Sequence, residues 1–88
     1  MVNITKGKKN TWVTFVLECG EEPVIKGSWD GWKEHIMKKR KDGKYSYRRP
    51  FKQGAYEFGY MCENRWITEN ELPKNANPFG GENSVLVI

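Results

Sequence analysis

Apolar and polar side chains alternate with a period of two in several short segments of the chain. In residues 11–17 the side chains of Val13 and Phe15 follow this spacing, and in residues 55–61 three aromatic side chains do so. The pattern is typical of a β-strand with one buried face. We expect the following alternating positions to face the core: Val13, Phe15, Tyr56, Phe58, Val85 and Val87.

Turn-forming residues separate the alternating segments. Asp42-Gly43 is a strong hairpin signal, and Pro50 marks a strand end or a sheet edge. No window has the 3.6-residue periodicity of a helix. The predicted strands cover residues 11–17, 24–27, 36–37, 44–51, 55–61, 65–68 and 84–88. About seven short strands with turns every ~8–12 residues predict an all-β fold, an immunoglobulin-like antiparallel β-sandwich.

The two ends of the chain differ from its middle. Residues 1–10 are polar and rich in lysine, which predicts a flexible N-terminal tail, and residues 69–83 form a long polar loop. Residues 11–88 then make up the β-sandwich. A chain of 88 residues has room for one domain and little room for a deep enzyme cleft.

Composition, charge and cysteine content indicate the class of partner and the cellular compartment. Aromatic residues make up 14% of the chain, so some rings are expected outside the core, where exposed rings usually serve recognition. The net charge of +4 comes from basic residues interleaved with acids, which favours a solvated surface over a nucleic-acid footprint. Cys19 and Cys62 form no Cys-x-x-Cys pair, so we expect no zinc site. Because the start is too polar for a signal peptide and no apolar run is long enough to span a bilayer, we expect a cytoplasmic protein with both thiols reduced.

The residues that enzymes need are scarce. His35 is the only histidine, and its charged neighbours predict a surface imidazole. Gly80-Gly81 is expected to form a tight turn, and no phosphate-binding glycine motif is present. We therefore expect no enzyme activity, no catalytic residue, no metal and no cofactor.

The placement of Trp32 and Trp66 is more informative, because both lie in or beside predicted loops. A flat indole can cover the apolar face of a sugar ring while nearby amides and acids bond the hydroxyl groups around its rim. The alternative is that both rings belong to the core. The residues alone leave these two interpretations open.

Three ordered motifs resemble carbohydrate-binding module family 48. These are Val24–Trp32, which resembles its Gly-[Ser/Asp]-Phe-Asn-x-Trp signature, Tyr56–Trp66, and the closing Asn77–Val85 segment. The family includes the early-set domains of glycogen branching and debranching enzymes and the glycogen-binding domain of the AMP-activated protein kinase beta subunit. The closing segment is most similar to that of small stand-alone bacterial isoamylase early-set domains.

The resemblance implies a carbohydrate-binding site. Trp32 and Trp66 match the two ring-stacking tryptophans, Asn83 the hydroxyl-bonding asparagine, and Phe79 an apolar residue that touches the sugar. Trp29 matches a phenylalanine that is usually core, so it is expected to be structural. Two positions depart from the kinase domain: Glu57 stands in place of a sugar-binding lysine and Gly81 in place of a threonine.

Three functions follow in order of preference. The first is binding of an α-glucan such as glycogen, starch or a maltooligosaccharide, by a monomer. The second is a regulatory domain that docks on an enzyme of glycogen metabolism and has little sugar affinity. The third, well behind, is weak binding of nucleic acid through residues 38–41 and nearby tyrosines. No membrane partner is expected.

Overall fold

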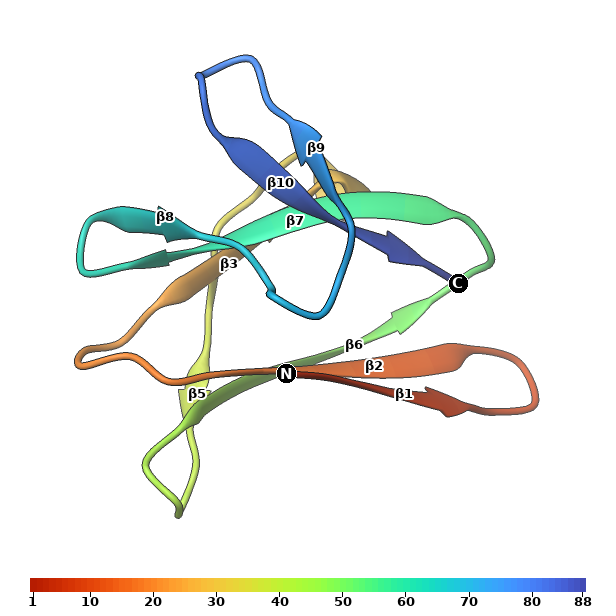
Figure 1. Cartoon of the computed structure of the whole chain (residues 1–88). Coiled ribbons are helices and arrows are strands. Elements are labelled where there is room, and N and C mark those ends of the chain that lie inside the picture. Colours follow the sequence, from red (N-terminus) through yellow and green to blue (C-terminus); the bar gives the residue numbers. More distant parts are fainter.

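The computed structural model describes all 88 residues as two antiparallel sheets packed face to face (Figure 1). The lower sheet in Figure 1 consists, in spatial order, of β1 (Val2–Lys6), β2 (Thr11–Leu17), β6 (Tyr45–Phe51) and β5 (Lys38–Lys39). The upper sheet has the order β4 (His35–Ile36), β3 (Val24–Gly27), β7 (Ala55–Cys62), β10 (Glu82–Val87) and β9 (Lys74–Ala76). Its sixth strand, β8 (Arg65–Ile67), forms a hairpin with the end of β7. The expected all-β sandwich is confirmed.

Large rings fill the space between the sheets. Phe15 from the lower sheet meets Phe58 from the upper one with ring centroids 4.9 Å apart. Both side chains are fully buried, as are those of Val13 and Tyr60. Trp29 packs against the same cluster, with its ring 5.2 Å from that of Phe51, so its expected structural role is confirmed. Edge-to-face aromatic pairs of this kind suit a small domain, because each ring buries a large area.

The inward phase of β10 differs from the expected one. Ser84 and Leu86 face the core, while Val87 is 68% exposed and Val85 is only half-buried. The reason is a hydrogen bond: the Glu69 backbone N–H donates to the Ser84 hydroxyl at 2.7 Å. A buried serine that has a partner costs little, and residues 85–88 are apolar in both phases, so the strand can pack with either set of side chains inward.

The connection before β10 is also more ordered than the sequence indicated. Glu69 is buried; its carboxylate accepts a hydrogen bond from the Tyr60 hydroxyl at 3.0 Å and contacts the Met1 ammonium at 2.6 Å. Burial, together with the negative charge of Glu69, raises the pKa of Tyr60. This interior contact holds the start of a segment that was expected to be a loop throughout but contains β9.

The N-terminal residues and the strand count need correction. Val2–Lys6 was expected to lie in a loose tail, but it forms β1 and pairs with β2 along its whole length. The sequence also predicted about seven strands, whereas the structure contains ten. The extra strands are short or exposed, so they bury too few side chains to produce a period-two pattern.

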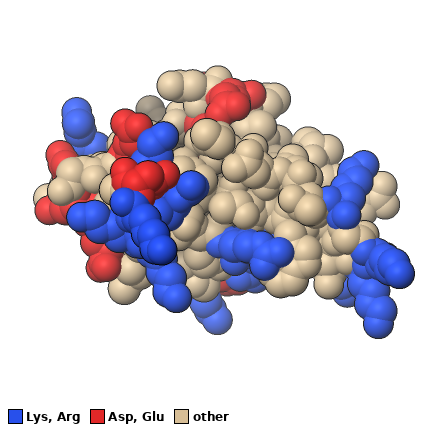
Figure 2. Space-filling view, turned by 90° about the horizontal axis from the view of Figure 1, so that it is seen from below, with Lys and Arg blue, Asp and Glu red and all other residues tan.

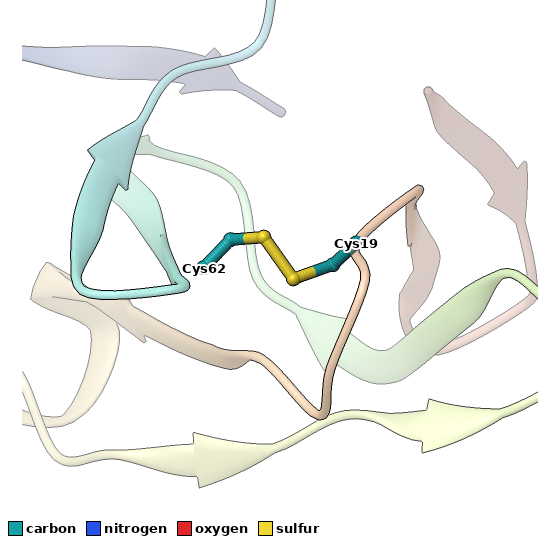
Figure 3. Close-up of a disulfide and its surroundings, with 2 residues drawn as sticks. All are labelled: Cys19 and Cys62. Atoms are coloured by element: carbon teal, nitrogen blue, oxygen red, sulfur yellow. A yellow bond between two sulfur atoms is a disulfide. The ribbon is translucent and has the colours of Figure 1, made fainter.

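The two cysteines form a disulfide, contrary to the expectation that both are reduced (Figure 3). Cys19 follows β2 and Cys62 ends β7, so the bond joins the two sheets. The residues are 43 positions apart, and only the folded chain brings their Cα atoms within 6.1 Å. Disulfides persist mainly in oxidising compartments, so the expected cytoplasmic location loses the support of the thiols. No helix in the structure has the length and apolarity needed to cross a membrane.

Candidate functional site

A groove of about 570 Å³ lies on the outer face of the upper sheet. Three segments that are distant in sequence meet there: the end of β3 with the loop that follows it, the β7–β8 hairpin, and the β9–β10 loop. The groove is lined by Lys26, Trp32, Met61, Trp66, Asn77, Pro78, Phe79, Gly81 and Asn83. Four of the five predicted site residues therefore line one surface, and the fifth, Glu57, contacts a lining residue.

Trp66 lies over a glycine. A methyl group at Gly59 would fall 2.1 Å from the indole, so only a residue without a side chain leaves room for the ring. Met61 and Trp66 are cross-strand partners in the hairpin. The indole N–H donates to the Glu82 carbonyl at 2.8 Å. These contacts fix the ring, which was expected to be solvent-exposed and is half-buried.

Trp32 is held by an unusual backbone conformation. Its φ is +68°, and that of the preceding Gly31 is +77°. A bulky residue in the left-handed region costs about 1–2 kcal/mol, so the surrounding structure must impose it. The Trp32 N–H donates to the Gly27 carbonyl at 3.0 Å, which closes the loop. The loop thus turns the indole toward the groove, where it remains 36% exposed.

The β9–β10 loop presents Phe79 at its tip. The Asn77 side-chain oxygen accepts hydrogen bonds from the backbone N–H groups of Phe79 and Gly81, each at 3.0 Å. Gly80, with φ +86°, makes the turn between them. The Phe79 ring is 93% exposed, a large apolar surface with no partner in the chain.

Asn83 lies at the bottom of the groove and is buried. Its amide nitrogen donates to Glu57 Oε1 at 3.2 Å, and its oxygen accepts from the Asn77 amide at 3.2 Å. An amide has two donor hydrogens and two acceptor lone pairs, so one of each remains. The network orients Asn83 and joins Glu57 to the loop that carries Phe79.

The sequence interpretation missed four lining side chains, namely Lys26, Met61, Asn77 and Pro78. The first two could have been found from strand phase. Since Ile25 and Tyr60 are buried, their neighbours Lys26 and Met61 must face outward on adjacent strands. Asn77 gave no periodic signal, because it belongs to a loop.

Beside the groove, Asp30 anchors the loop that carries Trp32. Burial opposes ionisation of Asp30, but hydrogen bonds from His35 and from the Lys33 N–H, with the charges of His35 and Arg49, outweigh it and lower its pKa. His35 was expected to be a surface imidazole. It is half-buried instead, bonded to Asp30 and stacked on Tyr47 at 5.2 Å.

Comparison with known proteins gives one family. Residues 7–88 match the family described as the glycogen recognition site of AMP-activated protein kinase. A search of curated proteins finds no match. The match covers the segments that form the groove, from β3 to β10.

Proposed function

Because the chain belongs to the family of the glycogen recognition site of AMP-activated protein kinase, a family of carbohydrate-binding modules, we propose that its groove binds α-glucan without catalysis. The observation that carries the proposal is the convergence of two indoles, Trp32 and Trp66, on one groove floored by the Asn83 amide. Glycogen, starch and maltooligosaccharides share the α-glucan chemistry that such a groove recognises.

The chemistry of the lining suits a neutral sugar chain. Aromatic faces cover the C–H faces of glucose rings, while the amides of Asn77 and Asn83 exchange hydrogen bonds with hydroxyl groups. The lining contains no carboxylate, imidazole, hydroxyl or thiol side chain. Those are the groups that cleave or transfer glycosyl units, so the arrangement favours binding over reaction.

Native affinity electrophoresis in gels with and without glycogen tests the proposal. We expect the wild type to be retarded, and Trp32→Ala or Trp66→Ala to remove the retardation because each deletes a stacking face. Asn83→Ala should weaken it less. The matched control is Trp12→Ala, since Trp12 lies on the other sheet beneath Arg48 and should not affect retardation.

Tryptophan fluorescence provides a second measurement. Addition of β-cyclodextrin should change the emission of the wild type, because Trp32 and Trp66 would lose contact with water. A dissociation constant of about 1 mM corresponds to a binding free energy of roughly 4 kcal/mol. If the wild type shows neither retardation nor a fluorescence change at about millimolar sugar, the glucan proposal is wrong.

One observation favours a docking domain as the second candidate. Apolar side chains outside the groove are exposed on the same sheet, with Ile36 at 63% and Val87 at 68%. Together with Phe79 they present more apolar surface than a sugar chain needs. Such a domain would bind an enzyme of glycogen metabolism and would fail both glucan tests.

The dependence of binding on salt concentration distinguishes nucleic-acid binding from glucan binding. Figure 2 shows the lower sheet from outside, with Lys and Arg at both ends and between them, and with most of the visible Asp and Glu among the group at the left. Arg40 pairs with Asp42 and Lys44 with Glu18, so part of this charge is neutralised. Glucan retardation should change little between low and moderate salt, whereas binding to phosphates weakens steeply.

A further inference from the structure

We propose that Lys26 gives the groove a preference for α-glucans that carry an anionic substituent, such as a phosphate monoester, over neutral ones. This inference rests on the proposed function and specifies the class of glucan. It starts from a residue that sequence comparison did not single out.

Lys26 lies on β3, the strand that leads into the loop carrying Trp32. Its cross-strand partner on β7 is Gly59, the residue beneath the Trp66 ring. It lines the groove together with Trp32, Trp66 and Asn83, and it is half-buried. No other lining side chain is ionisable. A glucan that stacks on the indoles would therefore lie against the one ionisable side chain of the lining.

The charge of Lys26 is not neutralised within the protein. Lys26 takes part in no ion pair and no side-chain hydrogen bond. Glu57, two residues from Gly59 on β7, makes no ion pair with Lys26, and its Oε1 accepts a hydrogen bond from the Asn83 amide. Lys26 thus retains its donors for a ligand.

Ligand binding changes the surroundings of this charge. A neutral glucan would displace water from the ammonium of Lys26 and offer only hydroxyl oxygens in return. Removing a charge from water without a counter-charge is unfavourable. A phosphate monoester carries about −1.5 to −2 charge and strong acceptor oxygens, so it would compensate the lost hydration.

Calorimetry with three ligands tests the inference: β-cyclodextrin, mono-phosphorylated β-cyclodextrin and mono-carboxymethyl β-cyclodextrin. At low ionic strength we expect the wild type to bind the two anionic ligands about three- to fivefold tighter than the neutral one, as for a partly exposed ion pair. A similar preference for both would assign it to charge, and a preference for the phosphate alone would assign it to phosphate geometry. The difference should narrow as salt rises.

Variants identify the source of the preference. Lys26→Met keeps most of the apolar stem and should remove the preference, whereas Lys26→Glu should reverse it. The matched control is Lys38→Met, which makes the same change of charge on the lower sheet and should keep the wild-type ratio. Thermal melts establish that each variant is folded.

Two sets of results are distinguishable. Equal affinity of the wild type for all three ligands, or an unchanged ratio in Lys26→Met, would overturn the role of Lys26 and leave the glucan proposal intact. If the wild type binds none of the three ligands, the glucan proposal itself is overturned.

Discussion

A glycine lies beneath each of two tryptophan rings, and the two pairs serve different parts of the molecule. A methyl group at Gly27 would fall 2.5 Å from the Trp29 ring, which packs on the core. At Gly59 it would fall 2.1 Å from the Trp66 ring, which lines the groove. Neither glycine has a positive φ, so the backbone would accept alanine at both positions. The rings alone require glycine there.

The substitution Gly59→Ala therefore tests how Trp66 is held. The added methyl should displace the indole, cost about 1–3 kcal/mol of unfolding free energy as overpacking does, and weaken glycogen retardation. Chemical denaturation and affinity gels measure the two effects.

The control is the double variant Gly59→Ala, Trp66→Ala. Once the ring is absent, adding the methyl should change stability by no more than about 0.5 kcal/mol, as for most surface substitutions. An equal cost of Gly59→Ala with and without Trp66 would show that the glycine serves the strand and not the ring.

At the scale of elements, the short 3-10 turn η1 (Ser28–Asp30) connects the groove to both sheets. Asp30 bonds His35 of β4 in the upper sheet and lies 4.0 Å from Arg49 of β6 in the lower sheet. Trp32 follows two residues later. A single carboxylate thus fixes the loop that positions one of the stacking rings.

The lowered pKa of Asp30 predicts a pH dependence of stability. A group whose pKa is lower in the folded state stabilises the fold at pH above its unfolded value of about 3.9. That contribution is lost as pH falls through the folded value. We expect the wild type to be more stable than Asp30→Asn near neutral pH, and the difference to shrink below about pH 4. Urea denaturation of both proteins between pH 2 and pH 7, in steps of about one pH unit, measures this difference in stability. A difference that stays constant over this range would contradict the assignment.

Strands with a strong pattern could be predicted from sequence, and weak ones could not. The bounds of β2 and β3 agree with the predicted residues 11–17 and 24–27. In β10 the existence of a strand was predicted but its phase was not, because Ser84 is buried by a hydrogen bond from a residue 15 positions away. Long-range polar partners of this kind leave no local pattern.

The candidate site shows the same division. Resemblance pointed to Trp32, Trp66, Phe79 and Asn83, and the structure places all four at one groove. It did not point to Lys26, since a residue becomes a lining residue only when neighbouring strands are assembled. The burial of Asn83 likewise depends on Glu57 and Asn77, which approach it from another strand and from a loop.

At the scale of the whole molecule, the disulfide is the one covalent link between the sheets besides the chain itself. Figure 3 shows Cys19, in the connection after β2, reaching across to Cys62 at the end of β7. Crosslinking residues 43 positions apart restricts the unfolded chain, and the chain-entropy estimate for such a loop is about 4 kcal/mol. Since small domains have only ~5–15 kcal/mol of total stability, this is a substantial share.

Reduction should therefore destabilise the protein without abolishing its binding. The Cys19→Ser, Cys62→Ser variant should lose about 2–4 kcal/mol of unfolding free energy, measured by urea denaturation. A reductant should lower the wild type to the stability of this variant and leave the variant unchanged, which separates the disulfide from side effects of the substitutions. Glycogen retardation of the folded variant should persist, because Trp66 is held by Gly59 and Glu82 within the upper sheet and not by the disulfide. Equal stability of the wild type with and without reductant would mean that the disulfide contributes nothing to the fold. Loss of glycogen retardation in a folded variant would mean that the position of the β7–β8 hairpin depends on the disulfide.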